Sequence, residues 1–305
     1  MAFENVFSWS KSRAEQFGEC RRKYFYDKYA SWGGWDAASA RATRSAYVLK
    51  NLKNRFAWKG ETVHHTIEGI LKSLRKDQPI PFEEARDHLT KVMRADWRSS
   101  KAKKNWEDPK RNLGLFEHEY EKPVSDATWK KVHDEALECL RNFYHSGLYQ
   151  ELLDDKKENW LLIEDLEDFT LDGAKIFVKL DFARKKDGVA EIYDWKTGKS
   201  DKEASLQIGA YAMYAMQKWG IPLERIRAYL FNLSFELPQP EPQVLTTALL
   251  DQTRALIAQS VGEMKDLLSD PERNIPKAPE DFAYTEDERR CSYCNFYKIC
   301  GKYAV

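Results

Sequence analysis

Apolar residues recur at helical spacing throughout the first half of the chain. Phe17, Cys20 and Tyr24 follow this spacing behind a capping serine at position 8 or 10, which predicts a helix over residues 8–30 that Gly33-Gly34 ends. No stretch between residues 30 and 155 has the alternation of a strand. The sequence predicts further helices over residues 40–75 (in two pieces), 82–104 and 126–153.

After residue 155 the pattern changes to short alternating or apolar runs. Four consecutive strands are predicted, over residues 158–163, 167–171, 174–184 and 188–196. Asp172-Gly173 and Asp187-Gly188 have the composition of tight hairpin turns between these strands. The remaining predicted elements are a helix over 202–218, a strand over 225–233, a candidate strand over 242–247 and a helix over 248–269.

This order of elements predicts a mixed α/β fold. A mainly helical part, residues 1–155, would pack on an α/β core, residues 156–270. A tail rich in cysteine, residues 271–305, would then close on Cys20. Neither an internal repeat nor a long linker divides the chain, so we expect one domain over residues 1–305.

The composition indicates where the protein is located but leaves its activity open. The chain has 305 residues, of which 42% are hydrophobic and 32% charged, and no apolar run is long enough to span a membrane. The N-terminus lacks the layout of a signal peptide, so we expect a cytoplasmic protein without a membrane partner. The formal net charge of zero neither supports nor excludes nucleic acid. Short charged runs, such as the acidic run over 164–168, are interpreted as solvated surface.

Two acids and a lysine form the first candidate for chemistry. Side chains alternate along a strand, so Asp194 and Lys196 project from one face while Trp195 projects from the other. Asp181 lies on the preceding predicted strand and would approach Asp194 across the hairpin. Converging carboxylates repel unless a cation lies between them, and Mg²⁺ or Mn²⁺ suits their oxygens. Asp-x-Lys is common by chance, however, and by itself a surface salt bridge explains it.

Neighbouring residues strengthen the functional interpretation. Gln207 and Tyr211 share one face of the predicted helix over 202–218, at positions i and i+4. His64 and Glu68 have the same relation, and His64 follows Gly60 in a Gly-x-x-x-His pattern. The adjacent His65 would point about 100° away around the helix, so both histidines could not easily bind one ion.

The cysteines form the second candidate. Five are present, an odd number in an apparently cytosolic chain, which argues against a disulfide framework. Cys139 lies in a helical pattern and is expected to pack as a small apolar residue. The other four could hold zinc or an iron–sulfur cluster, and their one-plus-three spacing departs from the paired pattern usual for zinc. These four are Cys20, Cys291, Cys294 and Cys300.

Taken in order, these motifs resemble the PD-(D/E)xK nucleases, specifically the RecB-like branch that carries an iron–sulfur cluster. That branch includes nuclease domains of bacterial helicase–nuclease complexes and CRISPR-associated exonucleases that trim prespacers. The resemblance implies a restriction-endonuclease-like mixed sheet flanked by helices, a 4Fe–4S cluster on the four cysteines, and a catalytic Mg²⁺ or Mn²⁺. One departure is Leu180, where the family name implies proline before the acid.

The resemblance also implies a role for each residue of the site. His64, Asp181, Asp194 and the main-chain carbonyl of Trp195 would bind the catalytic metal. Lys196 would be the catalytic lysine, and Gln207 and Tyr211 would position the lysine or the substrate strand. Glu68 would orient the ring of His64.

The function implied is that of a metal-dependent DNA nuclease. We expect an exonuclease acting on single-stranded DNA or DNA ends, in DNA repair, recombination, or a phage or defence system. The alternative is a nucleic-acid-binding or scaffolding subunit of a helicase–nuclease or defence complex, and structure-selective endonuclease activity also stays open. The chain lacks a Walker-type phosphate-binding motif, so any helicase motor would belong to a partner.

Overall fold

A five-stranded mixed sheet lies at the centre of the computed structural model, which describes residues 4–198 and 204–302. Its order is β1-β4-β5-β6-β7, with β5 and β6 parallel and the other neighbours antiparallel. The strands are β1 (Trp160–Ile163), β4 (Phe182–Lys186), β5 (Val189–Lys196), β6 (Ile226–Asn232) and β7 (Glu241–Gln243). The mixed α/β architecture expected from the sequence is thus confirmed.

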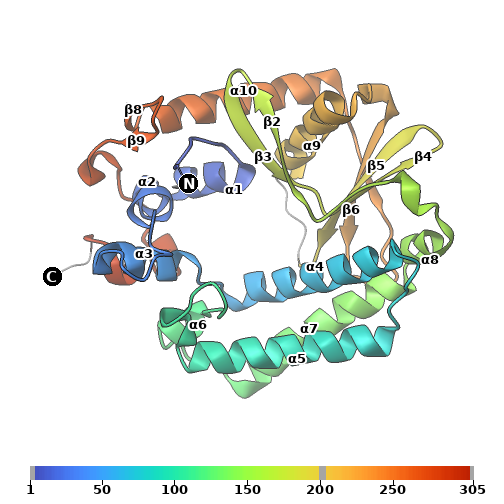
Figure 1. Cartoon of the computed structure of the whole chain (residues 1–305), viewed down its shortest axis with the longest axis horizontal. Coiled ribbons are helices and arrows are strands. Elements are labelled where there is room, and N and C mark those ends of the chain that lie inside the picture. Colours follow the sequence, from blue (N-terminus) through green and yellow to red (C-terminus); the bar gives the residue numbers. More distant parts are fainter. Residues whose placement is uncertain (1–3, 199–203, 303–305) are drawn as a thin grey trace.

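Helices cover both faces of this sheet (Figure 1). On one face, Phe182, Tyr193 and Trp195 point into a core shared with four helices. On the other, Ala183 and Ile192 point into a second core, shared with two long helices and with Phe17 and Tyr24 of the N-terminal helices. Because side chains alternate along a strand, the sheet separates two apolar layers. The first layer contains α4 (Arg55–Leu74), α5 (Phe82–Lys101), α7 (Asp126–His145) and α8 (Gly147–Asp154), and the second contains α9 (Ala204–Trp219) and α10 (Thr247–Lys265).

The strand predicted over 174–184 is wrong as a continuous element. It divides at Leu180–Asp181 into β3 (Ala174–Lys179) and β4, and β3 pairs with β2 (Leu166–Leu171) in a separate two-stranded sheet. The alternation of apolar and polar residues continues from β3 into the start of β4, so the sequence shows no break at Leu180–Asp181. Both predicted hairpin turns do form, with positive φ angles at Asp172 and Gly173 (47° and 77°) and at Asp187 and Gly188 (50° and 79°).

Two predicted helices are also interrupted, each at a side chain that caps a new helix. Cys20 is extended, with φ of −166°, and its sulfur accepts a hydrogen bond from the main-chain N–H of Lys23. Ser146 likewise caps α8 through the N–H of Tyr149. The helices over 8–30 and 126–153 are therefore each broken, since helical periodicity alone does not reveal a residue that stops one helix and starts another.

The other predicted boundaries shift by a few residues. Residues 202–203 of one predicted helix lie outside the described residues, and the final long helix ends at Lys265 rather than at residue 269. No strand occurs between residues 30 and 155, all of which are described, apart from an isolated bridge between Lys53 and Leu115.

The remaining elements are short. The α-helices are α1 (Lys11–Glu19), α2 (Arg21–Phe25), α3 (Arg41–Lys50), α6 (Phe116–Glu119) and α11 (Glu288–Cys291), and Tyr26–Ala30 forms a π-helix. Strands β8 (Leu268–Asp270) and β9 (Ile275–Pro276) pair with each other. Single 3-10 turns span Lys104–Trp106, Lys157–Asn159, Leu223–Arg225, Pro279–Asp281 and Tyr297–Ile299. No helix among the described residues is long and apolar enough to cross a bilayer.

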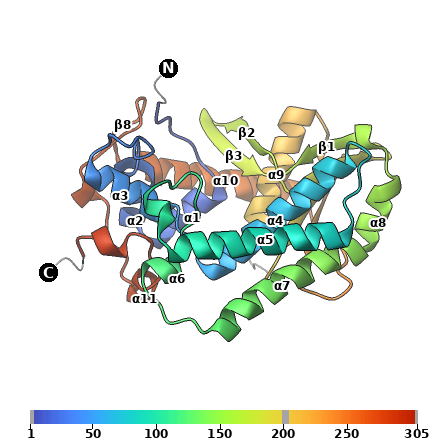
Figure 2. The ribbon, with the colours of Figure 1, turned by 60° about the horizontal axis from the view of Figure 1, so that its bottom comes forward.

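The last described residues pack beside the first helices (Figure 2). Arg22 donates to the carbonyl of Phe282 at 3.0 Å, and Tyr26 donates to the carbonyl of Ile299 at 3.0 Å. The ring of Phe296 joins Leu49 and Leu52 in a small apolar core. The N-terminal helices therefore depend on residues more than 200 positions away for part of their packing.

Helices α9 and α10 pack closely at Gly209, and substitution of this glycine tests how tightly the two helices fit. A Cβ atom at Gly209 would lie 2.1 Å from Oγ1 of Thr253, whereas a Cβ at Gly262, also helical, would meet nothing within 4 Å. Gly209→Ala should therefore lower the free energy of unfolding by about 1–3 kcal/mol through overpacking. Gly262→Ala should leave it unchanged or raise it by up to about 1 kcal/mol. Urea denaturation measures both, and a Gly209→Ala variant as stable as the parent would contradict the close packing.

Candidate active site and cysteine pocket

Helix α4 crosses the sheet at the end where β5 finishes. A Cβ atom at Gly60 would lie only 3.0 Å from Oγ1 of Thr197, just beyond β5. The glycine thus lets the helix approach the strand end closely, and His64 follows one turn later on the same ridge. This is the physical basis of the Gly-x-x-x-His spacing in this chain.

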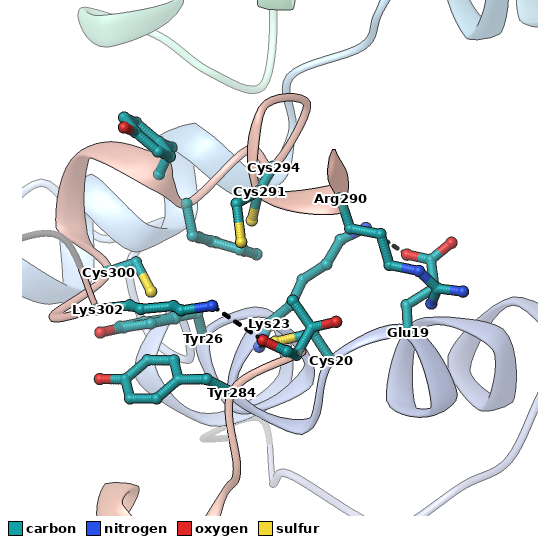
Figure 3. A pocket seen from close by; sticks show the side chains of 13 residues that line it. Glu19, Cys20, Lys23, Tyr26, Tyr284, Arg290, Cys291, Cys294, Cys300 and Lys302 are labelled. Atoms are coloured by element: carbon teal, nitrogen blue, oxygen red, sulfur yellow. Dashed lines mark hydrogen bonds and ion pairs between the residues drawn. The ribbon is translucent and has the colours of Figure 1, made fainter. Parts of the chain in front are cut away.

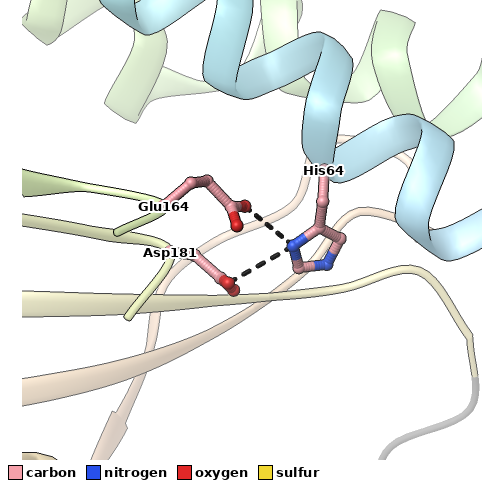
Figure 4. A group of neighbouring side chains, drawn as sticks. All are labelled: His64, Glu164 and Asp181. Atoms are coloured by element: carbon pink, nitrogen blue, oxygen red, sulfur yellow. Dashed lines mark hydrogen bonds and ion pairs between the residues drawn. The ribbon is translucent and has the colours of Figure 1, made fainter. Parts of the chain in front are cut away.

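His64 meets two acids that come from different strand ends (Figure 4). Its Nδ1 lies 2.9 Å from Oε1 of Glu164, which follows β1, and 3.3 Å from Oδ1 of Asp181, which precedes β4. The three side chains can present ligand atoms that all lie within 4.8 Å of one another. Glu164 has a positive φ of 53°, uncommon for this residue type and a feature that recurs at functional sites.

Burial and charge shift the pKa values of these three groups. Burial and the charges of Asp194 and Glu164 outweigh the opposing effect of His64, so the pKa of Asp181 is raised to about 6. Burial also lowers the pKa of His64, but the charges of Asp181 and Glu164 outweigh this and raise it well above its usual value. For Glu164, hydrogen bonds and charge from His64 and Lys179 outweigh burial, so its pKa is lowered. Carboxylates held this close and this deep favour a bound cation.

A second set of side chains organises Asp194. Gln207 donates to Oδ1 of Asp194 at 2.9 Å, and Tyr211 donates to the same oxygen at 3.1 Å. Nζ of Lys196 lies 2.7 Å from Oδ2 of Asp194 and 3.4 Å from Oε1 of Gln207. The hydroxyl of Tyr211 also contacts the carbonyl of Lys179 at 2.6 Å, so this network links α9 to β3 and β5.

The predicted site residues therefore gather at one end of the sheet, in two adjoining sets. His64 and Asp181 lie together, but Asp194 falls outside their 4.8 Å group and is turned toward Lys196. The main-chain N–H of Trp195 donates to Oδ2 of Asp181 at 2.6 Å, while its ring packs in the core. Their catalytic and metal-binding roles remain predictions.

Glu164 is the residue that the sequence interpretation missed. The acidic run over 164–168 was expected to be solvated, but Glu164 is only 5% exposed and pairs with His64. Glu68, the expected partner of His64, instead pairs with Lys72 at 2.7 Å. The sequence did offer one indication: Glu164 directly follows a predicted apolar strand, and acids at strand ends can converge at one end of a sheet.

A groove lies beside the second set and reaches Lys196. Its volume is about 1320 Å³, open solvent at its mouth included, and its walls come from the start of α1, from β3 and from α9. Its charged lining residues are Lys11, Arg13, Glu15, Lys179 and Lys196, of which only Glu15 is acidic. This lining suits a polyanion.

The four cysteines other than Cys139 line one pocket (Figure 3). Cys20 comes from the break between α1 and α2, and Cys291, Cys294 and Cys300 come from the tail, around a pocket of about 490 Å³, open solvent at its mouth included. Burial raises the pKa of Cys294 to about 11 and also raises that of Cys300. Cys139, by contrast, is 1% exposed within the helical core, as expected for a packing residue.

Comparison with known proteins agrees with this arrangement. The family model of the PD-(D/E)XK nuclease superfamily matches residues 8–301. The chain belongs to the PD-(D/E)XK nuclease superfamily. Membership places it among phosphodiester-hydrolysing nucleases that use divalent metal ions.

Other comparisons add little to this superfamily assignment. No curated protein matches the sequence significantly. Among solved structures, the crystal structure of SSO0001 is similar over 62% of this chain and 80% of that chain, with 16% identity and a TM-score of 0.29. At that TM-score the likeness carries no argument about fold or function.

The raised pKa of Asp181 leads to a prediction about stability without metal. The folded protein binds the Asp181 proton more tightly than the unfolded chain, whose pKa is 3.8, so the unfolding free energy falls as pH rises toward about 6. Asparagine does not titrate. With a chelator present to remove metal, Asp181→Asn should therefore be more stable than the parent above about pH 6, by up to about 3 kcal/mol. This difference in stability should shrink near pH 4.

Thermal unfolding with and without Mn²⁺ checks this prediction. Added Mn²⁺ should raise the melting temperature of the parent and have little effect on Asp181→Asn. Asp251→Asn, which changes an exposed acid on α10, should respond as the parent does. An Asp181→Asn protein that is less stable than the parent at every pH would contradict the raised pKa of Asp181.

Proposed function

We propose that this chain is a metal-dependent deoxyribonuclease that removes nucleotides from single-stranded DNA or DNA ends. The observation that carries the proposal is the convergence of His64, Glu164 and Asp181 beside the Asp194–Lys196 pair. Lys196 also lines a groove whose charged side chains are mostly basic. Superfamily membership supports phosphodiester hydrolysis. The choice of DNA, of exonuclease action and of a repair, recombination or defence setting is part of the proposal.

The donor atoms fit a divalent metal ion. His64, Glu164 and Asp181 would hold it, with Asp194 as a further ligand, and these oxygen-rich donors suit Mg²⁺ or Mn²⁺. An imidazole ligand favours Mn²⁺ of the two. When bound, such an ion polarises the phosphodiester and promotes the ionisation of water.

Side chains around the ion would stabilise the developing charge and hold the reacting groups in position. Lys196 is 20% exposed at the groove wall, where its charge would stabilise the negative charge that grows on the phosphate as water attacks. In that step a water oxygen bonds to phosphorus, the ester P–O bond breaks, and the leaving oxygen gains a proton. Gln207 bridges Lys196 and Asp194, so it would keep both in position.

The cysteine pocket would hold a 4Fe–4S cluster. Four cysteine thiols line one pocket, and four is the number of thiolates that such a cluster requires. Their one-plus-three spacing along the chain departs from the paired spacing usual for zinc, which supports the cluster over a single zinc ion. The cluster would cross-link α2 to the tail.

Substitution of Asp194 tests the proposed hydrolysis. Asp194→Asn keeps the side-chain shape but removes the negative charge, so cleavage should fall by at least about 10²-fold with folding intact. The assay is digestion of end-labelled single- and double-stranded DNA with Mg²⁺ or Mn²⁺, which also gives polarity and metal preference. Asp251→Asn is the control and should cleave as the parent does. An Asp194→Asn protein that cleaved at the parental rate would rule out this site, and a parent that bound DNA without cutting it would indicate a binding subunit.

Cysteine substitutions test the cluster. Protein purified without oxygen should be brown, with broad absorption near about 400 nm and on the order of one cluster per chain. Cys291→Ala should lose the colour and destabilise the contact between tail and N-terminal helices, whereas Cys139→Ala should keep the colour because Cys139 lies in the helical core. Iron and zinc analysis gives the content, and a colourless protein with one zinc per chain would overturn the cluster.

A further inference from the structure

An exposed aromatic ring lies on the same ridge of α4 as His64. Phe56, Gly60 and His64 occupy positions i, i+4 and i+8. The ring of Phe56 belongs to a side chain that is 58% exposed, although most apolar residues of α4 are buried. Along the helix axis Phe56 lies about 12 Å from His64, with Gly60 and the end of β5 between them.

The ring is held in place from one side. The guanidinium of Arg55 lies over it, 4.3 Å from the ring centroid. Arg55 is fixed in turn by Glu117, whose carboxylate is 4% exposed and lies 3.0 Å from Nη1 of Arg55. The same carboxylate accepts the main-chain N–H of Arg55 at 3.1 Å.

This arrangement leaves the other face of the ring available. No other ring of the described residues stacks on Phe56. Phe56 belongs to neither main core, so core packing does not account for a ring at this position. Its remaining face suits a flat, electron-rich ligand next to a negatively charged backbone.

We propose that Phe56 stacks on a nucleobase of the single strand held in the active site, with Arg55 beside that strand's phosphates. This deepens the proposed function and rests on it. The distance of about 12 Å corresponds to about three or four nucleotides from the bond that is cut, at about 3.4 Å per stacked nucleotide. Because stacking on phenylalanine reads no base edge, the contact grips any sequence.

Binding measurements on the full chain test the proposal. The probe is a fluorescein-labelled oligodeoxythymidylate, with a second series that carries one abasic nucleotide at each position in turn. All proteins carry Asp194→Asn so that the probe survives. Phe56→Ala should weaken binding of the intact probe about tenfold, as expected for loss of one base–aromatic stack. Phe56→Trp should restore it, and Leu256→Ala, which removes an exposed apolar side chain from α10, should have no effect.

The abasic series separates stacking from a general effect on structure. One abasic position should weaken binding by the parent by a similar factor and cause no further loss in Phe56→Ala. Equal binding of the intact probe by parent and Phe56→Ala, losses that multiply at every position, or no binding by the parent would each overturn the proposal. Cleavage by the chain with native Asp194 is read separately, so a failure of hydrolysis is distinguishable from a failure of stacking.

Discussion

The repulsion between buried carboxylates is the constraint on which the site depends. Asp181 and Asp194 lie at the ends of adjacent strands, both at most 5% exposed, and a third buried acid, Glu164, joins Asp181 at His64. Such groups would not gather without a compensating charge. In the free protein His64, Lys179 and Lys196 pair with these acids. Burial and the charge of Asp194 nevertheless keep the pKa of Asp181 raised to about 6, which is why this end of the sheet is suited to a divalent cation.

The rest of the fold holds these charges in place. Helix α4 approaches the sheet closely enough to deliver His64 because Gly60 has no side chain. On the opposite face, Gln207 and Tyr211 of α9 hold Asp194 through hydrogen bonds. The two helical layers therefore each contribute one side of the site, and neither layer alone would complete it.

Local patterns predicted most elements of the fold, and the ordered motifs selected candidate site residues that the fold brings to one end of the sheet. Periodicity gave the helices, and Asp187-Gly188 set the hairpin that places Asp181 near Asp194. Glu164 was missed because its burial depends on β1 pairing with β4, a contact between distant segments. The division at Leu180–Asp181 was missed for a similar reason, since two short strands with one alternating pattern look like a single long strand. The turn of Asp194 toward Lys196 depends on side-chain contacts that no spacing rule contains.

The packing of the tail against the first helices also affects how the chain is made. Leu49 and Leu52 leave the ribosome long before Phe296, which completes their small apolar core. At about 5–20 residues per second, this wait lasts on the order of tens of seconds. During synthesis the N-terminal helices therefore lack part of their packing until after the central sheet has been translated. A ribosome that stalled late would release a chain with an exposed apolar patch, a natural target for chaperones and proteases.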